Sequence, residues 1–165
     1  MHNNMHEIKD TLIIFAVLAV LLILYHNSKP EQREHFLIND LKERLQVINK
    51  NFNKLQIHEG SSSYTEDKSV IYLCLRDERG NYYPMNTLMY VVLHEIAHIL
   101  NKENYGHTPE FHDIFNKLLC KASEKRVYNP DIEHGDMYCG VDISGISHPQ
   151  CTILEGLDEI EHLSL

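Results

Sequence analysis

The sequence lacks several short motifs that mark common classes of protein. None of its four cysteines forms a C-x-x-C pair, so a separate structural zinc site is not expected. A phosphate-binding glycine motif and a G-x-S-x-G nucleophile elbow are also absent, which argues against a nucleotide-binding protein and a serine hydrolase of the α/β class. The even number of cysteines would allow disulfides in an oxidising compartment, although their spacing does not require them.

Basic residues are few. The chain has 15 Lys and Arg against 24 Asp and Glu, and residues 108–165 hold eleven acidic and four basic side chains. Proteins that bind nucleic acid normally show a basic face, so direct nucleic-acid binding is not expected here. At 165 residues the chain has room for one catalytic domain and an appendage.

The residues that imply a reaction lie at positions 91–98, which read V-V-L-H-E-I-A-H. His94 and His98 are four residues apart, so on a helix both imidazoles lie on one face and can bind one metal ion. In an H-E-x-x-H motif the two histidines bind Zn²⁺, and the glutamate takes a proton from the water that attacks a carbonyl. The alternative is a pair of core histidines beside a chance glutamate. Burying these groups without a metal would be costly, so we predict His94 and His98 as ligands and Glu95 as the general base.

A catalytic zinc site of this kind needs a third protein ligand. The metzincin pattern would need Gly at position 101 and His at position 104, and both are Asn, which excludes that class. A downstream glutamate is conceivable, but none lies in a recognisable motif; the candidates are Glu110, Glu124 and Glu133.

His107 is the better candidate for the third ligand. It stands nine residues after His98, where Gly106 allows the chain to turn back. Thr108 and Pro109 then fit the N-cap and first position of a helix. That helix would carry an apolar stripe with i, i+3, i+4 spacing, formed by Phe111, Ile114, Phe115, Leu118, Leu119 and Ala122.

The sequence H-E-I-A-H followed by G-H-T-P-E-F resembles the WLM and SprT-like metallopeptidases, the group that includes the Spartan protease, with WLM the nearer match. The segments S-Y-T-E-D-K-S-V-I-Y-L-C-L-R, N-T-L-M-Y-V-V-L and Y-C-G are also similar to that family, from about residue 63 to 143. The resemblance implies a zinc peptidase acting on protein or peptide substrates. It would also suggest cleavage of proteins attached to DNA, but the acidic charge argues against direct DNA binding.

Two features depart from the family pattern. The gap between His98 and His107 is longer than in many WLM members, which leaves the conformation of this loop open. His112 stands where the family often has Trp, which places an extra imidazole near the predicted site.

Residues 11–25 contain no charge and are mostly apolar. As a helix this segment is roughly 22 Å long, against a hydrocarbon core of about 30 Å. A cleaved signal peptide and a buried core helix are the alternatives, but we predict an uncleaved single-pass anchor that contacts membrane lipid. One basic residue precedes the segment and four follow it within twenty residues, so the positive-inside rule predicts a cytoplasmic catalytic domain.

Two further elements follow from periodicity. Residues 31 to about 53 are predicted as an amphipathic helix, either packed on the domain or forming a coiled-coil stalk, because apolar residues recur at Phe36, Leu37, Leu41, Leu45, Ile48, Phe52 and Leu55. Residues 69–75 read as a strand, either interior or at a sheet edge where an extended substrate could pair with it. Residues 138–143 read as a short strand or closing segment. Candidates to steady the oxyanion of a tetrahedral intermediate are Tyr105, Tyr128, Tyr138 and His134.

We therefore predict an α+β, zincin-like fold in which a small sheet packs on a zinc-binding helix, preceded by an N-terminal transmembrane helix. The expected segments are a polar N-terminus (1–10), the anchor (11–25), a linker with the amphipathic helix (26–62), a WLM-like core (63–148) and an acidic tail (149–165). The predicted function is a membrane-anchored zinc metallopeptidase. The alternatives are a deformylase-like zinc hydrolase with Cys74 as a ligand, and a non-enzymatic zinc-containing membrane adaptor.

Overall fold

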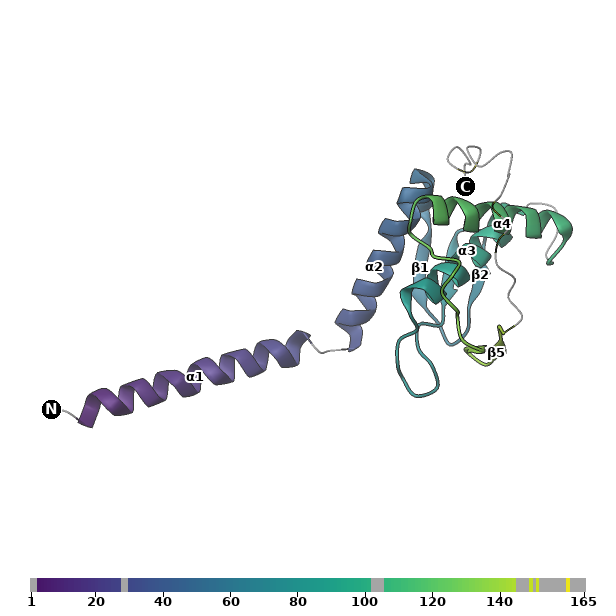
Figure 1. Cartoon of the computed structure of the whole chain (residues 1–165). Helices are drawn as coiled ribbons and strands as arrows, with labels where there is room; N and C mark the ends of the chain where they lie inside the picture. The colour runs from purple at the N-terminus through teal and green to yellow at the C-terminus, as the bar shows by residue number, and fades with distance from the viewer. Residues whose placement is uncertain are drawn as a thin grey trace. The chain divides into compact units, whose positions relative to one another are not determined.

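The structure, a computed structural model, describes residues 3–27, 30–101 and 106–144 together with Pro149, Cys151 and Ile160 (Figure 1). The chain divides into two compact units, Met1–Phe36 and Leu37–Leu165. The second unit holds the predicted site. It begins inside the segment that we expected to serve as linker and amphipathic helix, so part of that segment folds with the core.

The first unit contains α1 (Asn3–Asn27), whose large apolar side chains from Leu12 to Tyr25 are exposed. Over the residues that the structure describes, no helix has the length and apolar character needed to cross a membrane. The predicted transmembrane anchor at residues 11–25 is therefore wrong, and so is the single-pass localisation; the cytoplasmic orientation was derived from that anchor and loses its basis. The physical reason is length, because an uncharged helical run of roughly 22 Å falls short of the ~30 Å hydrocarbon core.

The helix α2 (Pro30–Ile48) buries residues at three- and four-residue spacing, namely Ile38, Leu41, Leu45 and Ile48. Phe36 was expected on this stripe but is 70% exposed. The helix ends before the predicted boundary because Asn49 caps the following 3₁₀ helix η1 (Lys50–Lys54), its side chain accepting a hydrogen bond from the Asn51 amide. Phe52 and Leu55 nevertheless reach the core, so this region packs on the domain as the first alternative expected.

A three-stranded sheet lies beside these elements. It contains β1 (Gln56–Glu59), β2 (Tyr64–Glu66) and β3 (Val70–Leu73) in the order β1-β3-β2. The central strand β3 pairs in parallel with β1 and antiparallel with β2. The strand predicted at residues 69–75 is thus the interior one, and β2, a segment to which we assigned no element from the sequence, forms one edge of the sheet.

Two helices complete the core. The helix α3 (Met85–Leu100) contacts β2 and β3 and is apolar on most of its surface, while α4 (Pro109–Glu124) packs against it (Figure 1). Thr108 caps α4 by accepting a hydrogen bond from the Phe111 amide, and Pro109 opens the helix. The α+β part of the predicted fold class therefore agrees with the structure.

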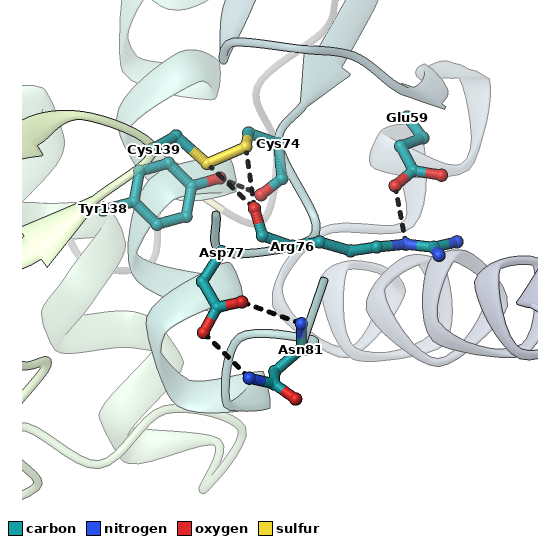
Figure 2. Close-up of polar contacts among 7 residues, drawn as sticks. All are labelled: Glu59, Cys74, Arg76, Asp77, Asn81, Tyr138 and Cys139. Carbon is teal, nitrogen blue, oxygen red and sulfur yellow. Dashed lines mark hydrogen bonds and ion pairs between the residues drawn. A yellow bond between two sulfur atoms is a disulfide. The ribbon is translucent and has the colours of Figure 1, made fainter. Parts of the chain in front are cut away.

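A short hairpin formed by β4 (Met137–Tyr138) and β5 (Val141–Asp142) is joined to the end of β3 by the Cys74–Cys139 disulfide (Figure 2). The Tyr138 hydroxyl donates to the Cys74 carbonyl at 2.7 Å, beside the disulfide. A second disulfide links Cys120 of α4 to Cys151. All four cysteines are thus paired, an outcome that their spacing had left open.

The chain turns sharply after β3, at residues 76–81. The Asp77 carboxylate accepts hydrogen bonds from the Asn81 amide and side chain, and Gly80 supplies the positive φ of 81° that the turn requires (Figure 2). Arg76 forms an ion pair with Glu59 at 3.1 Å, which connects this segment to the end of β1.

Candidate metal centre

Three histidines converge at the C-terminal part of α3. The Nε2 atoms of His94 and His98, one helical turn apart, are 3.2 Å from each other. His107, from the segment before α4, places its Nε2 3.0 Å from that of His94. Potential ligand atoms of the three side chains all lie within 4.8 Å of one another, so this group could hold a metal ion.

The donor geometry suits a metal better than hydrogen bonding. Each imidazole nitrogen carries one hydrogen or one lone pair, so His94 Nε2 cannot make good hydrogen bonds to both neighbours. Ligands at 2.0–2.1 Å from a tetrahedral Zn²⁺ lie about 3.3 Å apart, close to the distances found here. Within the described ranges no other trio of His, Cys, Asp or Glu forms such a group, and the three downstream glutamates are not part of it.

His112, which the sequence resemblance placed near the predicted site, is not a member of the group either. It is exposed on α4, with its ring centroid 6.2 Å from that of His107. The structure therefore groups His107, and not His112, with the two histidines of α3.

Burial favours the neutral form of the two helical histidines. It lowers the pKa of His94 to about 3, with smaller contributions from His98, His107 and His112. Burial also lowers the pKa of His98, assisted by His107. A metal must displace any proton from a ligand nitrogen, so both rings are in the form that binds a cation at neutral pH.

A phenylalanine forms the wall behind the three rings. Phe111 is fully buried on the first turn of α4, and its ring centroid is 4.4 to 4.9 Å from those of His94, His98 and His107. Such contacts limit how far each imidazole can turn away from a common point. We had assigned Phe111 only to the apolar stripe, because its spacing shows that it faces inward but not which rings it meets.

The two helices are tied together at the site. Asn101, the C-cap residue of α3, donates a hydrogen bond from its side-chain amide to the Thr108 hydroxyl at 3.4 Å. Thr108 is the N-cap of α4 and the neighbour of His107. The start of α4 therefore holds the third histidine against α3. The unusually long gap after His98 includes residues 102–105, which lie outside the described residues.

Glu95 is placed for proton transfer beside the histidines. Only 7% of this residue is exposed, and its carboxylate Oε2 accepts a hydrogen bond of 2.9 Å from the Thr65 hydroxyl on β2. Burial raises the pKa of Glu95, and the Thr65 hydrogen bond partly offsets that shift. A carboxylate with a raised pKa is a better proton acceptor, which suits a general base.

His94 and Glu95 line two cavities. One, of about 540 Å³, runs along β2 and is also lined by His98 and His107. The other, of about 520 Å³, lies under the β4–β5 hairpin and is lined mainly by apolar groups, among them Tyr90, Val91, Val141 and Ile143. A ligand longer than a single residue could therefore pass the histidines with a part in each cavity.

The four oxyanion candidates have different positions. Tyr138 and Glu95 both line the cavity under the β4–β5 hairpin, but the Tyr138 hydroxyl already forms hydrogen bonds with the Cys74 carbonyl and the Ser63 hydroxyl. The Tyr128 hydroxyl is hydrogen-bonded to His134 Nε2 at 3.0 Å, and neither residue lines the two cavities beside Glu95. Tyr105 lies outside the described residues. None of the described candidates is thus free to contact a substrate oxygen without first changing its partners.

No family model matches the chain, and no solved structure matches it. Three viral proteins are similar in sequence. Uncharacterized protein 042R of invertebrate iridescent virus 3 is 45% identical over 91 residues, which cover 54% of this chain and 57% of that protein. Uncharacterized protein R325 of Acanthamoeba polyphaga mimivirus is 33% identical over 111 residues, or 62% of this chain and 56% of its own length. This chain thus spans little more than half of either relative.

The match to the third relative is more extensive. Uncharacterized protein 136R of invertebrate iridescent virus 6 is 35% identical over 135 residues, which cover 68% of this chain and 74% of that protein. At that identity and coverage, the chain belongs to the same family as protein 136R of invertebrate iridescent virus 6.

Proposed function

We propose that the protein is a zinc-dependent metallopeptidase of the WLM kind that hydrolyses peptide bonds. The convergence of His94, His98 and His107 beside a buried glutamate carries the proposal. A set of three imidazoles suits zinc, although copper, nickel and iron also accept such ligands. The sequence resemblance to the WLM peptidases supports the same reaction class.

The roles of the residues follow from their positions. The three histidines would hold Zn²⁺, and the bound ion would polarise the scissile carbonyl and lower the pKa of the attacking water. Glu95 takes the proton from that water and returns it to the leaving nitrogen. The low exposure of Glu95 keeps bulk water away from this transfer and holds its pKa above the ordinary value.

The edge strand β2 offers a place for an extended substrate. It pairs with β3 on one side, and no other described strand pairs with its second edge. Residues 63–65 line the cavity that contains the three histidines. A peptide could add as a further strand along β2 and pass its backbone across the metal site. For the strand at residues 69–75 the sequence had left open whether it is interior or pairs with a substrate, and in the structure it is interior.

The disulfide pattern bears on the deformylase-like alternative. A deformylase-like enzyme would need the thiolate of Cys74 as a zinc ligand, whereas Cys74 forms a disulfide with Cys139, which argues against this alternative. A disulfide sulfur carries no thiolate charge and is a poor zinc ligand. The alternative of a non-enzymatic protein with structural zinc would instead show bound metal and no peptide cleavage.

Metal analysis and peptide cleavage on the same samples test the proposal. Purified full-length chain should contain about one equivalent of zinc, and His94→Ala, His98→Ala and His107→Ala should each lose metal and activity. Glu95→Gln should keep the metal and lose activity by about 10²- to 10⁴-fold, the usual contribution of a general base. His112→Ala is the matched control, because it removes a nearby imidazole outside the group. Full activity in Glu95→Gln, or zinc retained by His107→Ala but lost by His112→Ala, would contradict the assignment.

A further inference from the structure

A hydroxyl on the edge strand holds the proposed general base. Thr65 is the middle residue of β2, and its position is fixed by pairing with Ile71 of β3. Its Oγ1 lies 2.9 Å from Glu95 Oε2 and 3.3 Å from the Glu95 backbone carbonyl. Thr65 therefore contacts both the side chain and the main chain of Glu95, from a different element of the fold.

The carboxylate has no other hydrogen-bond partner within the described part of the chain. The last torsion of a glutamate side chain is broad, so a carboxylate without partners has no single preferred orientation. One hydrogen bond to Oε2 selects an orientation and leaves Oε1 to accept a proton. Solvent could not easily replace this bond, because Glu95 is 7% exposed.

We propose that Thr65 is the positioning residue for Glu95, acting by holding Oε2 so that Oε1 receives the proton of the attacking water. The inference rests on the proposed peptidase function. It predicts that the Thr65 hydroxyl affects the chemical step and leaves metal binding and substrate affinity largely unchanged. A purely structural role, in which Thr65 only packs β2 against α3, would instead affect stability and all activities together.

The test uses the zinc-loaded full-length chain and a quenched fluorescent peptide selected from a library for cleavage by the wild type. Thr65→Val keeps the β-branched shape and removes the hydroxyl, and it should lower kcat by about tenfold with KM and zinc content near wild type. Thr65→Ser restores a hydroxyl and should recover most of kcat. Thr65→Ala takes the place of Thr65→Val if the valine variant does not fold. Thr87→Val is the matched control, because it removes the hydroxyl of a buried threonine on α3 itself, one that lines neither cavity beside Glu95.

A double variant shows whether Thr65 acts through Glu95. In the Glu95→Gln background, Thr65→Val should cause little additional loss, because the base that it positions is already gone. An equal fold-loss in both backgrounds would overturn the inference, as would an unchanged kcat in Thr65→Val or a loss that follows the zinc content. Glu95→Gln with full activity, or a wild type that cleaves no library peptide, would overturn the peptidase function itself. An inactive Glu95→Gln beside a fully active Thr65→Val overturns only the role of Thr65.

Discussion

Replacing Phe111 by Leu should weaken metal binding more than it weakens the fold. The substitution keeps an apolar side chain in a fully buried position but removes a ring that contacts His94, His98 and His107. The packing cost should be about 1–2 kcal/mol of unfolding free energy, since the leucine fills most of the space. Loss of the wall that orients the ligands should lower zinc affinity by about 10- to 100-fold, the range found when groups that support metal ligands are removed.

Phe52→Leu supplies the control for this prediction. Phe52 is also fully buried and aromatic, but it lies in η1 and contacts none of the three histidine rings. Urea unfolding of the zinc-free protein should show similar losses for the two variants. Competition with a chelating dye should show weaker zinc binding for Phe111→Leu alone. Equal zinc affinities for both variants would refute the idea that Phe111 orients the ligands.

Three other predictions concern pH, the hairpin disulfide and the start of α4. Zinc-free protein should lose stability as the pH falls from about 6.5 toward 3, because the pKa of His94 is about 3 in the folded protein and only the unfolded chain binds the proton in this window. Urea unfolding at about pH 7 and pH 5 should show a smaller change in unfolding free energy with pH for His94→Gln than for the wild type. An equal change in both proteins would argue against a buried neutral imidazole. Cys139→Ser should lower the unfolding free energy by about 2–4 kcal/mol and expose the β4–β5 hairpin to limited proteolysis. A hairpin equally protected in the wild type and the variant would show that the Cys74–Cys139 disulfide does not hold the hairpin in place. Thr108→Ala should cost about 1 kcal/mol in thermal or urea unfolding and Thr108→Ser much less, and equal costs would show that the cap hydrogen bond to Phe111 is not responsible.

The sequence was most informative where its pattern was long. The helical segments around Glu95 and after His107 could be predicted because apolar spacing, the N-cap Thr108 and Pro109 agree with one another. The grouping of His107 with the two α3 histidines could also be expected, since the H-E-x-x-H spacing needs one more ligand and the capped helix fixes where the chain returns.

Short or non-local features were beyond sequence reasoning. The strands β1 and β2 contain four and three residues, too few to show a period, so the edge strand and its Thr65 went unnoticed. The pairing of Cys74 with Cys139 joins residues 65 positions apart and depends on the fold. The prediction of a membrane anchor at residues 11–25 was wrong because it gave their apolar composition more weight than their length.

The Cys74–Cys139 bond closes a covalent ring in which every residue assigned to the metal centre is included. His94, Glu95, His98 and His107 all lie between the two cysteines. A single backbone cut anywhere from residue 75 to 138 would therefore give two pieces that stay joined through sulfur, at an effective concentration far above that of separate fragments. Such a nicked molecule would run as one band on a gel without thiol and as two bands with it. If the protein is the proposed peptidase and one copy cleaves another, this ring would keep the three histidines on one molecule after the cut.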